Sequence, residues 1–135
     1  MRKFLIATHG SFAEGIKSSL EMIAGSNENV HIIGAYTDGN KSIEEDLDRV
    51  LLQVGRNDEL IVFTDLAGGS ITSEILRLVQ GENIYVVAGI NLPLLLETVL
   101  ADPDAPAEEV IENGISSARD QIMFVSRILK QTSLK

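Results

Sequence analysis

Short apolar runs alternate with longer amphipathic stretches along this chain of 135 residues. The runs are continuous, rich in β-branched side chains, and cover residues 4–7, 30–33, 60–63 and 84–88. Runs of this kind are typical of strands that are buried on both faces, as in a parallel sheet. The pattern therefore predicts four parallel strands.

The longer stretches carry apolar residues at every third or fourth position, which is the spacing of one helix face. They cover residues 11–24, 42–54 and 71–79, with part of a fourth stripe at 95–100. Two of them begin with the sequence S-x-x-E, at Ser11 and Ser42. In that sequence the serine and glutamate can satisfy the unpaired amides of the first turn, so we expect both serines to cap helices.

This alternation predicts an α/β fold with an open, doubly wound, mostly parallel sheet and helices on both faces. We expect the flavodoxin-like strand order 2-1-3-4, which places the first and third strands side by side. The length suits one domain over residues 1–135. Helical spacing continues over residues 107–130, but 122–125 is also compatible with a strand, and periodicity does not decide between the two.

Composition narrows the chemistry. The chain has no cysteine, which excludes disulfides, thiolate zinc sites and cysteine nucleophiles. Its formal net charge of −9 argues against nucleic acid as a partner. The two histidines show no metal-ligand spacing, so we expect no metal and no cofactor. The first apolar run is too short for a signal peptide or a membrane span, and we expect a cytoplasmic protein.

The two histidines differ in their place along the predicted strands. His9 follows the first run almost directly, whereas His31 lies inside the second. Ligands of open α/β sheets bind beyond the carboxyl ends of the strands, where the strand order reverses. Asp65 follows the third run, next to the first strand in the predicted order. We expect His9 and Asp65 to face each other across this crevice and His31 to be structural.

An imidazole beside a carboxylate suits nucleophilic chemistry. A carboxylate that accepts from one ring nitrogen fixes the tautomer and leaves the other nitrogen able to attack. The same carboxylate stabilises the cationic ring that forms. Each residue alone also has a structural interpretation, since a strand-end histidine often packs and an aspartate after a strand often caps a turn.

A Gly68-Gly69-Ser70 sequence follows Asp65 and precedes the third predicted helix. Amides at a helix amino terminus bind anions, and glycine lets the backbone approach a ligand closely. Ser70 can cap the helix and also donate its hydroxyl to a phosphoryl oxygen. Because such sequences are also common in ordinary turns, the residues alone leave the reaction class open.

The segments ATHGSFAEGI, VFTDLAGGS and VVAGINLPLLLETVL occur in this order. Together they resemble the IIA component of the mannose/fructose/sorbose class of the bacterial sugar phosphotransferase system, over nearly the whole chain. The resemblance implies a phosphohistidine carrier that accepts a phosphoryl group from the phosphocarrier protein HPr. It implies transfer onward to a IIB component, which phosphorylates sugar as the membrane components IIC and IID import it.

The same resemblance implies roles for individual residues. His9 matches the phosphorylated nucleophile, Asp65 the carboxylate that orients it, and Ser70 a serine near the phosphoryl group, beside Gly68 and Gly69. It also implies a homodimer that exchanges a carboxyl-terminal strand, which would suit residues 122–125. Because the chain ends after one domain, we expect the IIB component to be a separate protein.

Two positions depart from the family pattern. Ile71 stands where proline is usual, and Ala67 stands where many members carry an aromatic residue. Because this loop should face the partner or the phosphoryl group, the two departures leave the partner and the sugar open but do not change the expected carrier chemistry. Two alternatives stay open: a phosphoryl donor domain related to that of dihydroxyacetone kinase, against which Gly10 argues, and a flavodoxin-like regulatory or binding module without catalysis.

Overall fold

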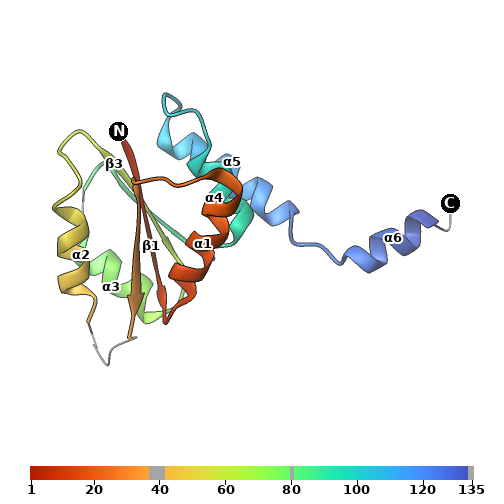
Figure 1. Cartoon of the computed structure of the whole chain (residues 1–135), viewed down its shortest axis with the longest axis horizontal. Coiled ribbons are helices and arrows are strands. Elements are labelled where there is room, and N and C mark those ends of the chain that lie inside the picture. The colour runs from red at the N-terminus through yellow and green to blue at the C-terminus, as the bar shows by residue number, and fades with distance from the viewer. Residues whose placement is uncertain (37–41, 80, 134–135) are drawn as a thin grey trace.

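A computed structural model of the chain describes residues 1–36, 42–79 and 81–133. Its four-stranded parallel sheet confirms the predicted order β2-β1-β3-β4 (Figure 1). The strands are β1 (Arg2–His9), β2 (Val30–Ala35), β3 (Glu59–Thr64) and β4 (Ile84–Ala88). All four predicted runs therefore lie within strands.

Helices cover both faces of the sheet, as predicted (Figure 1). On one face lie α1 (Phe12–Ala24), α4 (Leu92–Val99) and α5 (Ala107–Asp120). On the other lie α2 (Glu44–Leu51) and α3 (Ser70–Leu78). The described chain ends with α6 (Val125–Ser133), which projects away from the sheet in Figure 1.

Neighbouring residues of the central strands point to opposite faces of the sheet. In β1, Phe4 and Ile6 pack under α1 and α4, whereas Leu5 and Ala7 pack under α2 and α3. All four are buried. This two-sided burial explains why the runs are continuously apolar instead of alternating. It also fixes the sheet firmly, so that the strand ends have defined positions.

The helix starts differ in part from the sequence prediction. Ser11 occupies the N-cap position of α1 but makes no side-chain cap bond. Instead Thr8 Oγ1, in β1, accepts from the backbone amide of Ala13 at 2.8 Å. Ser42 Oγ does accept from the amide of Glu44, at 3.2 Å, although α2 begins only at Glu44. A hydroxyl fixed in a neighbouring strand satisfies the α1 amide, so the local serine is not needed there.

The carboxyl-terminal segment, residues 107–130, is helical in two parts, and residues 122–125, which the sequence left open between helix and strand, lie where the two parts meet. Helix α5 ends at Asp120, residues 122–124 are neither helix nor strand, and α6 begins at Val125. Within one chain this segment thus forms no strand, and exchange with a second copy stays a prediction. In the part of the chain that the structure describes, no helix is long and apolar enough to span a membrane.

Candidate functional site

His9 and Asp65 meet at the carboxyl edge of the sheet. His9 is the last residue of β1, and Asp65 directly follows β3, the neighbouring strand. The register pairs Ala7 of β1 with Thr64, the last residue of β3, so β1 extends two residues beyond the end of its neighbour, as far as His9. Sequence reasoning placed the two residues across one crevice, and the structure brings them into hydrogen-bond contact.

The Asp65 carboxylate holds His9 at two points. Its Oδ2 atom lies 2.8 Å from the ring nitrogen Nδ1 and accepts from the His9 backbone amide at 2.9 Å. Its Oδ1 atom accepts from the amide of Leu66 at 3.0 Å. Only 13% of the Asp65 side chain is exposed, against 41% for His9. The ring is thus anchored from the protein side and open toward solvent on the other.

Hydrogen bonding keeps Asp65 ionised. Burial raises the pKa of this carboxyl, but the bonds from the His9 amide and ring lower it, and the net pKa is below the ordinary value of 3.8. An ionised carboxylate accepts from Nδ1–H, so the electron pair of the imidazole lies on Nε2. In this tautomer Nε2 is the ring nitrogen that is able to act as a nucleophile.

The loop from Leu66 to Ser70 lies against the imidazole. A Cβ atom on Gly69 would lie 3.4 Å from His9 Cε1 and 3.2 Å from Leu66 Cβ, so the absence of a side chain makes room for the ring. The Gly69 amide donates to the Leu66 carbonyl at 3.2 Å, which corrects the expectation that it points at a ligand. The first amides of α3, which begins at Ser70, have no partner within the helix, and amides in this position are able to bind an anion.

Ser70 does not cap α3, contrary to one of its two predicted uses. The N-cap residue is Gly69, and Ser70 is the first residue of the helix. Its hydroxyl instead lies 3.1 Å from the phenolic oxygen of Tyr36. The Ser70 hydroxyl is therefore directed toward the end of β2 and not into its own helix.

Buried threonines fix this loop from below, and sequence reasoning missed them. Thr72 Oγ1 donates to the Leu66 carbonyl at 2.6 Å and lies 2.6 Å from Thr64 Oγ1. Thr64 and Thr72 are both buried. The contacts connect the end of β3 to the first turn of α3, so the loop that carries Asp65 has little freedom to move.

Tyr36 is a further residue that sequence reasoning missed. It directly follows β2, and its ring centroid lies 5.8 Å from that of His9. Its position after a strand at the sheet switch point was the available signal, the same one that pointed to His9 and Asp65.

Three positions next to the site residues, Gly10, Ala67 and Ile71, differ in conformation and burial. Gly10 has φ 57°, a left-handed conformation that favours glycine immediately after the histidine. Ile71 is fully buried in the core beneath α3, so it does not face a partner or a phosphoryl group as expected. Ala67, the other departure, is exposed. Only Ala67 lies where it can contact a partner directly.

The second histidine lies outside this site. His31 is within β2, opposite Leu5 of β1. Partial burial lowers its pKa from the ordinary 6.5, and the positive charges of Lys3 and Lys17 lower it further. Among the described residues no group of three histidine, cysteine or acidic side chains is arranged to hold a metal ion.

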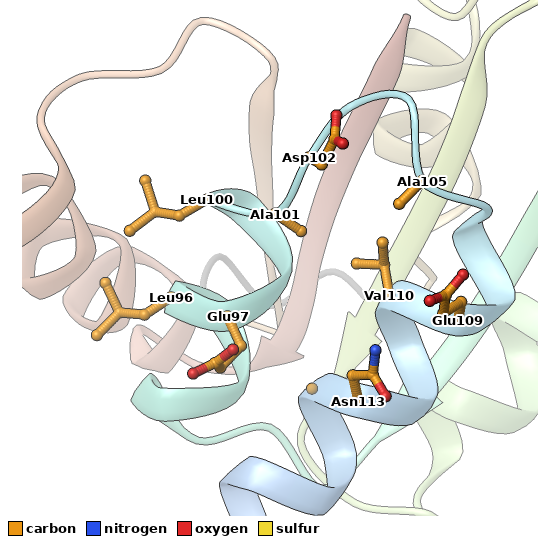
Figure 2. Close-up of a pocket in the computed structure, with 10 residues that line it drawn as sticks. Leu96, Glu97, Leu100, Ala101, Asp102, Ala105, Glu109, Val110 and Asn113 are labelled. Carbon is orange, nitrogen blue, oxygen red and sulfur yellow. The ribbon is translucent and has the colours of Figure 1, made fainter.

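A separate cleft lies between α4 and α5, near the amino-terminal end of β1 (Figure 2). Its volume is about 380 Å³, and its walls include the carboxylates of Glu97, Asp102 and Glu109. Arg2, the first residue of β1, donates to the Asp102 carbonyl at 3.2 Å, whereas His9 is the last residue of that strand. The cleft therefore takes no part in the His9 site.

Known proteins are similar to this chain in both sequence and fold. The mannose-specific EIIAB component of the phosphotransferase system (PTS) of Escherichia coli strain K12 is 30% identical over 121 residues, 87% of this chain. The chain spans only 38% of that relative. The EIIA component of Streptococcus agalactiae superposes with a TM-score of 0.79 at 32% identity, covering 94% of this chain and 99% of that one.

A protein of Klebsiella pneumoniae, described as a permease of the phosphoenolpyruvate-dependent sugar phosphotransferase system, superposes with a TM-score of 0.87 at 27% identity. That alignment covers 95% of this chain and 93% of the other. The profile of the EIIA-man family, "PTS system fructose IIA component", matches residues 3–115. These findings confirm the resemblance seen in the sequence motifs, and the chain belongs to the EIIA-man family of phosphotransferase-system IIA components.

Proposed function

We propose that this protein is a phosphohistidine carrier that accepts a phosphoryl group on His9 Nε2 and passes it on during sugar uptake. The observation that carries the proposal is the Nδ1–Asp65 contact of 2.8 Å on a ring that is 41% exposed. It leaves a nucleophilic nitrogen facing solvent, where a partner protein can present or remove a phosphoryl group.

In this reaction the His9 imidazole is the only nucleophile. The Nε2 electron pair forms the new N–P bond while the donor's bond to phosphorus breaks, and the donor keeps that electron pair. The Nδ1 proton stays between the ring and Asp65, whose negative charge stabilises the cationic phosphoimidazole. Positioning and charge supply most of the acceleration in phosphoryl transfer, and the α3 amides supply donors to the phosphoryl oxygens.

The donor in this proposal is HPr and the acceptor is a IIB component, with the membrane components IIC and IID served indirectly. Exposed apolar side chains beside the site support docking of proteins: Phe12 begins α1 and is 47% exposed, and Leu66 follows Asp65 and is 59% exposed. Exposed apolar groups around a polar centre are typical of protein interaction surfaces.

The test is transfer of labelled phosphate from phosphoenolpyruvate through purified enzyme I and HPr to this protein. We expect the wild-type protein to take up one acid-labile, base-stable phosphoryl group and His9→Ala to take up none. His31→Ala is the matched control and should be labelled at close to the wild-type rate. Label on His9→Ala at the wild-type rate would contradict the assignment. Chase of the label into IIB, against kinase subunits, separates the carrier from a donor for dihydroxyacetone kinase.

The proposal includes a homodimer. Residues 122–125 and the following helix α6 leave large apolar side chains exposed, among them Ile122 at 76% and Phe124 at 64%. In the described residues β4 is an edge strand that pairs only with β3. An exposed apolar segment and an open strand edge can cover each other between two copies. Light scattering should give about twice the chain mass of 14.7 kDa, and a value near 14.7 kDa would contradict it.

A further inference from the structure

Tyr36 contacts both His9, at the end of β1, and Ser70, at the start of α3. Its ring packs against His9 at a tilt of 46°, with the centroids 5.8 Å apart. Its phenolic oxygen lies 3.1 Å from Ser70 Oγ, on the first turn of α3. Tyr36 therefore spans from the imidazole to the anion-binding loop along the side of the crevice that faces β2.

The backbone of Tyr36 is in an unusual conformation. Its φ is 65°, and among the described residues it is the one residue other than glycine with a positive φ. A bulky side chain in this region is uncommon, and strained residues collect at functional sites. The side chain is 39% exposed, so core packing does not account for the choice of tyrosine.

The hydroxyl pair matches the chemistry of a phosphoryl group. Phosphoryl oxygens only accept hydrogen bonds, and serine and tyrosine hydroxyls can each either donate or accept. In the pair one hydroxyl donates to the other, and which one donates can change. When the Tyr36 hydroxyl donates, Ser70 Oγ accepts and its own proton is directed elsewhere, toward an incoming anion.

We propose that Tyr36 is a positioning residue of the phosphoryl site: its hydroxyl holds that of Ser70 in place for the phosphoryl group on His9. This inference rests on the proposed carrier function. It adds the residue that directly follows β2 to a site that the sequence motifs drew only from β1 and the loop after β3.

Two assays separate positioning from protein docking. The first measures the rate of labelling through enzyme I and HPr, and the second uses phosphoramidate, a small phosphoryl donor that needs no docking surface. Tyr36→Phe keeps the ring and removes only the hydroxyl. We expect it to slow labelling about three- to tenfold in both assays, because this factor corresponds to the usual net free energy of one hydrogen bond. An effect confined to HPr would overturn the proposal, since it would place Tyr36 in a docking surface.

A double-mutant cycle with Ser70 tests the route of the effect. If Tyr36 acts through Ser70, Tyr36→Phe should have no further effect in a Ser70→Ala background. An equal effect in both backgrounds would overturn the proposal. Tyr85→Phe is the matched control, because Tyr85 is the only other tyrosine and lies in β4, opposite Ile61, away from the strand ends. Its labelling rates should match those of the wild type.

The outcomes distinguish this inference from the proposed function. A wild-type protein that takes no label overturns the carrier function and the role of Tyr36 with it. A labelled wild-type protein, an unlabelled His9→Ala and a Tyr36→Phe variant at the wild-type rate overturn the role of Tyr36 alone. Thermal unfolding of Tyr36→Phe should match the wild type, so that a slower rate is not a loss of folded protein.

Discussion

His9 and His31 lie on adjacent parallel strands, yet their surroundings give them opposite chemistry. His9 ends β1, holds a carboxylate at 2.8 Å and leaves one ring nitrogen toward solvent. His31 lies inside β2, where burial and the charges of Lys3 and Lys17 lower its pKa and so favour the neutral ring. The carboxylate that would stabilise a cationic imidazole stands beside only one of them.

The difference follows from position along the strand more than from residue type. Inside a strand, both neighbours of a histidine are tied to the sheet and its surroundings are set by packing. At the carboxyl end of β1, the adjacent strand β3 has also ended, so its next residue, Asp65, is available to contact the ring. The sheet edge therefore turns one of two histidines into a nucleophile candidate.

The largest effect within this comparison, after loss of His9 itself, should come from removing the carboxylate. Asp65→Ala leaves the nucleophile but fixes neither its tautomer nor its orientation. Loss of the orienting carboxylate in a serine protease costs about 10⁴-fold, and a smaller loss, on the order of 10²-fold, is expected here because imidazole is itself the nucleophile. The measurement is the initial labelling rate with HPr in excess. A rate within twofold of wild type would make Asp65 a turn residue.

Gly69 should show the next largest effect, by a steric route. Gly69→Val places atoms against His9 Cε1 and the Leu66 carbonyl, where a Cβ atom alone would be at 3.4 and 3.3 Å. The displaced ring should lose up to about 10²-fold in labelling rate, comparable to loss of one preorganised group.

Gly68 provides the matched comparison for that steric effect. Among the described residues no heavy atom comes within 4 Å of a Cβ atom built on Gly68. Gly68→Ala should therefore slow labelling less than Gly69→Ala. Equal rates for the two alanine variants, both well folded by circular dichroism, would show that contact with the ring does not explain the need for glycine at Gly69.

The fold was predictable because burial on both sheet faces leaves a strong signal. Strands such as β3, with buried Leu60, Ile61, Val62 and Phe63, are continuously apolar, and their alternation with amphipathic stretches indicates a parallel sheet between helices. Once the order 2-1-3-4 is set, the meeting of His9 and Asp65 follows from topology alone. This part of the site needs no side-chain detail.

The details that failed depend on how neighbouring elements pack and on which side chain satisfies each backbone group. Ser11 matches a local capping pattern, but Thr8 in the preceding strand already supplies the oxygen. Tyr36 carries no local signal for a positive φ, which arises where β2 meets the α3 loop. Ile71 follows a glycine-rich loop sequence, yet it lies in the first turn of α3 with its side chain in the core.

The smallest effect should come from His31, and it should concern stability and not transfer. Because the folded pKa of His31 lies below 6.5, the unfolded chain binds a proton first as the pH falls. The free energy of unfolding should therefore decrease as the pH drops through 6.5 toward the folded pKa, and the contribution is constant above that window. His31→Gln removes this titration, so its stability should depend less on pH than that of the wild type between pH 7.5 and about 5. Urea unfolding of both proteins at both ends of this window measures the difference. An unchanged pH dependence would mean that burial and the two lysines do not disfavour the charged ring.

The same variant also tests phosphoryl transfer. A loss of labelling of His31→Gln at pH 7.5, where His31 is neutral in the folded and unfolded states, would contradict the view that only His9 takes part in transfer.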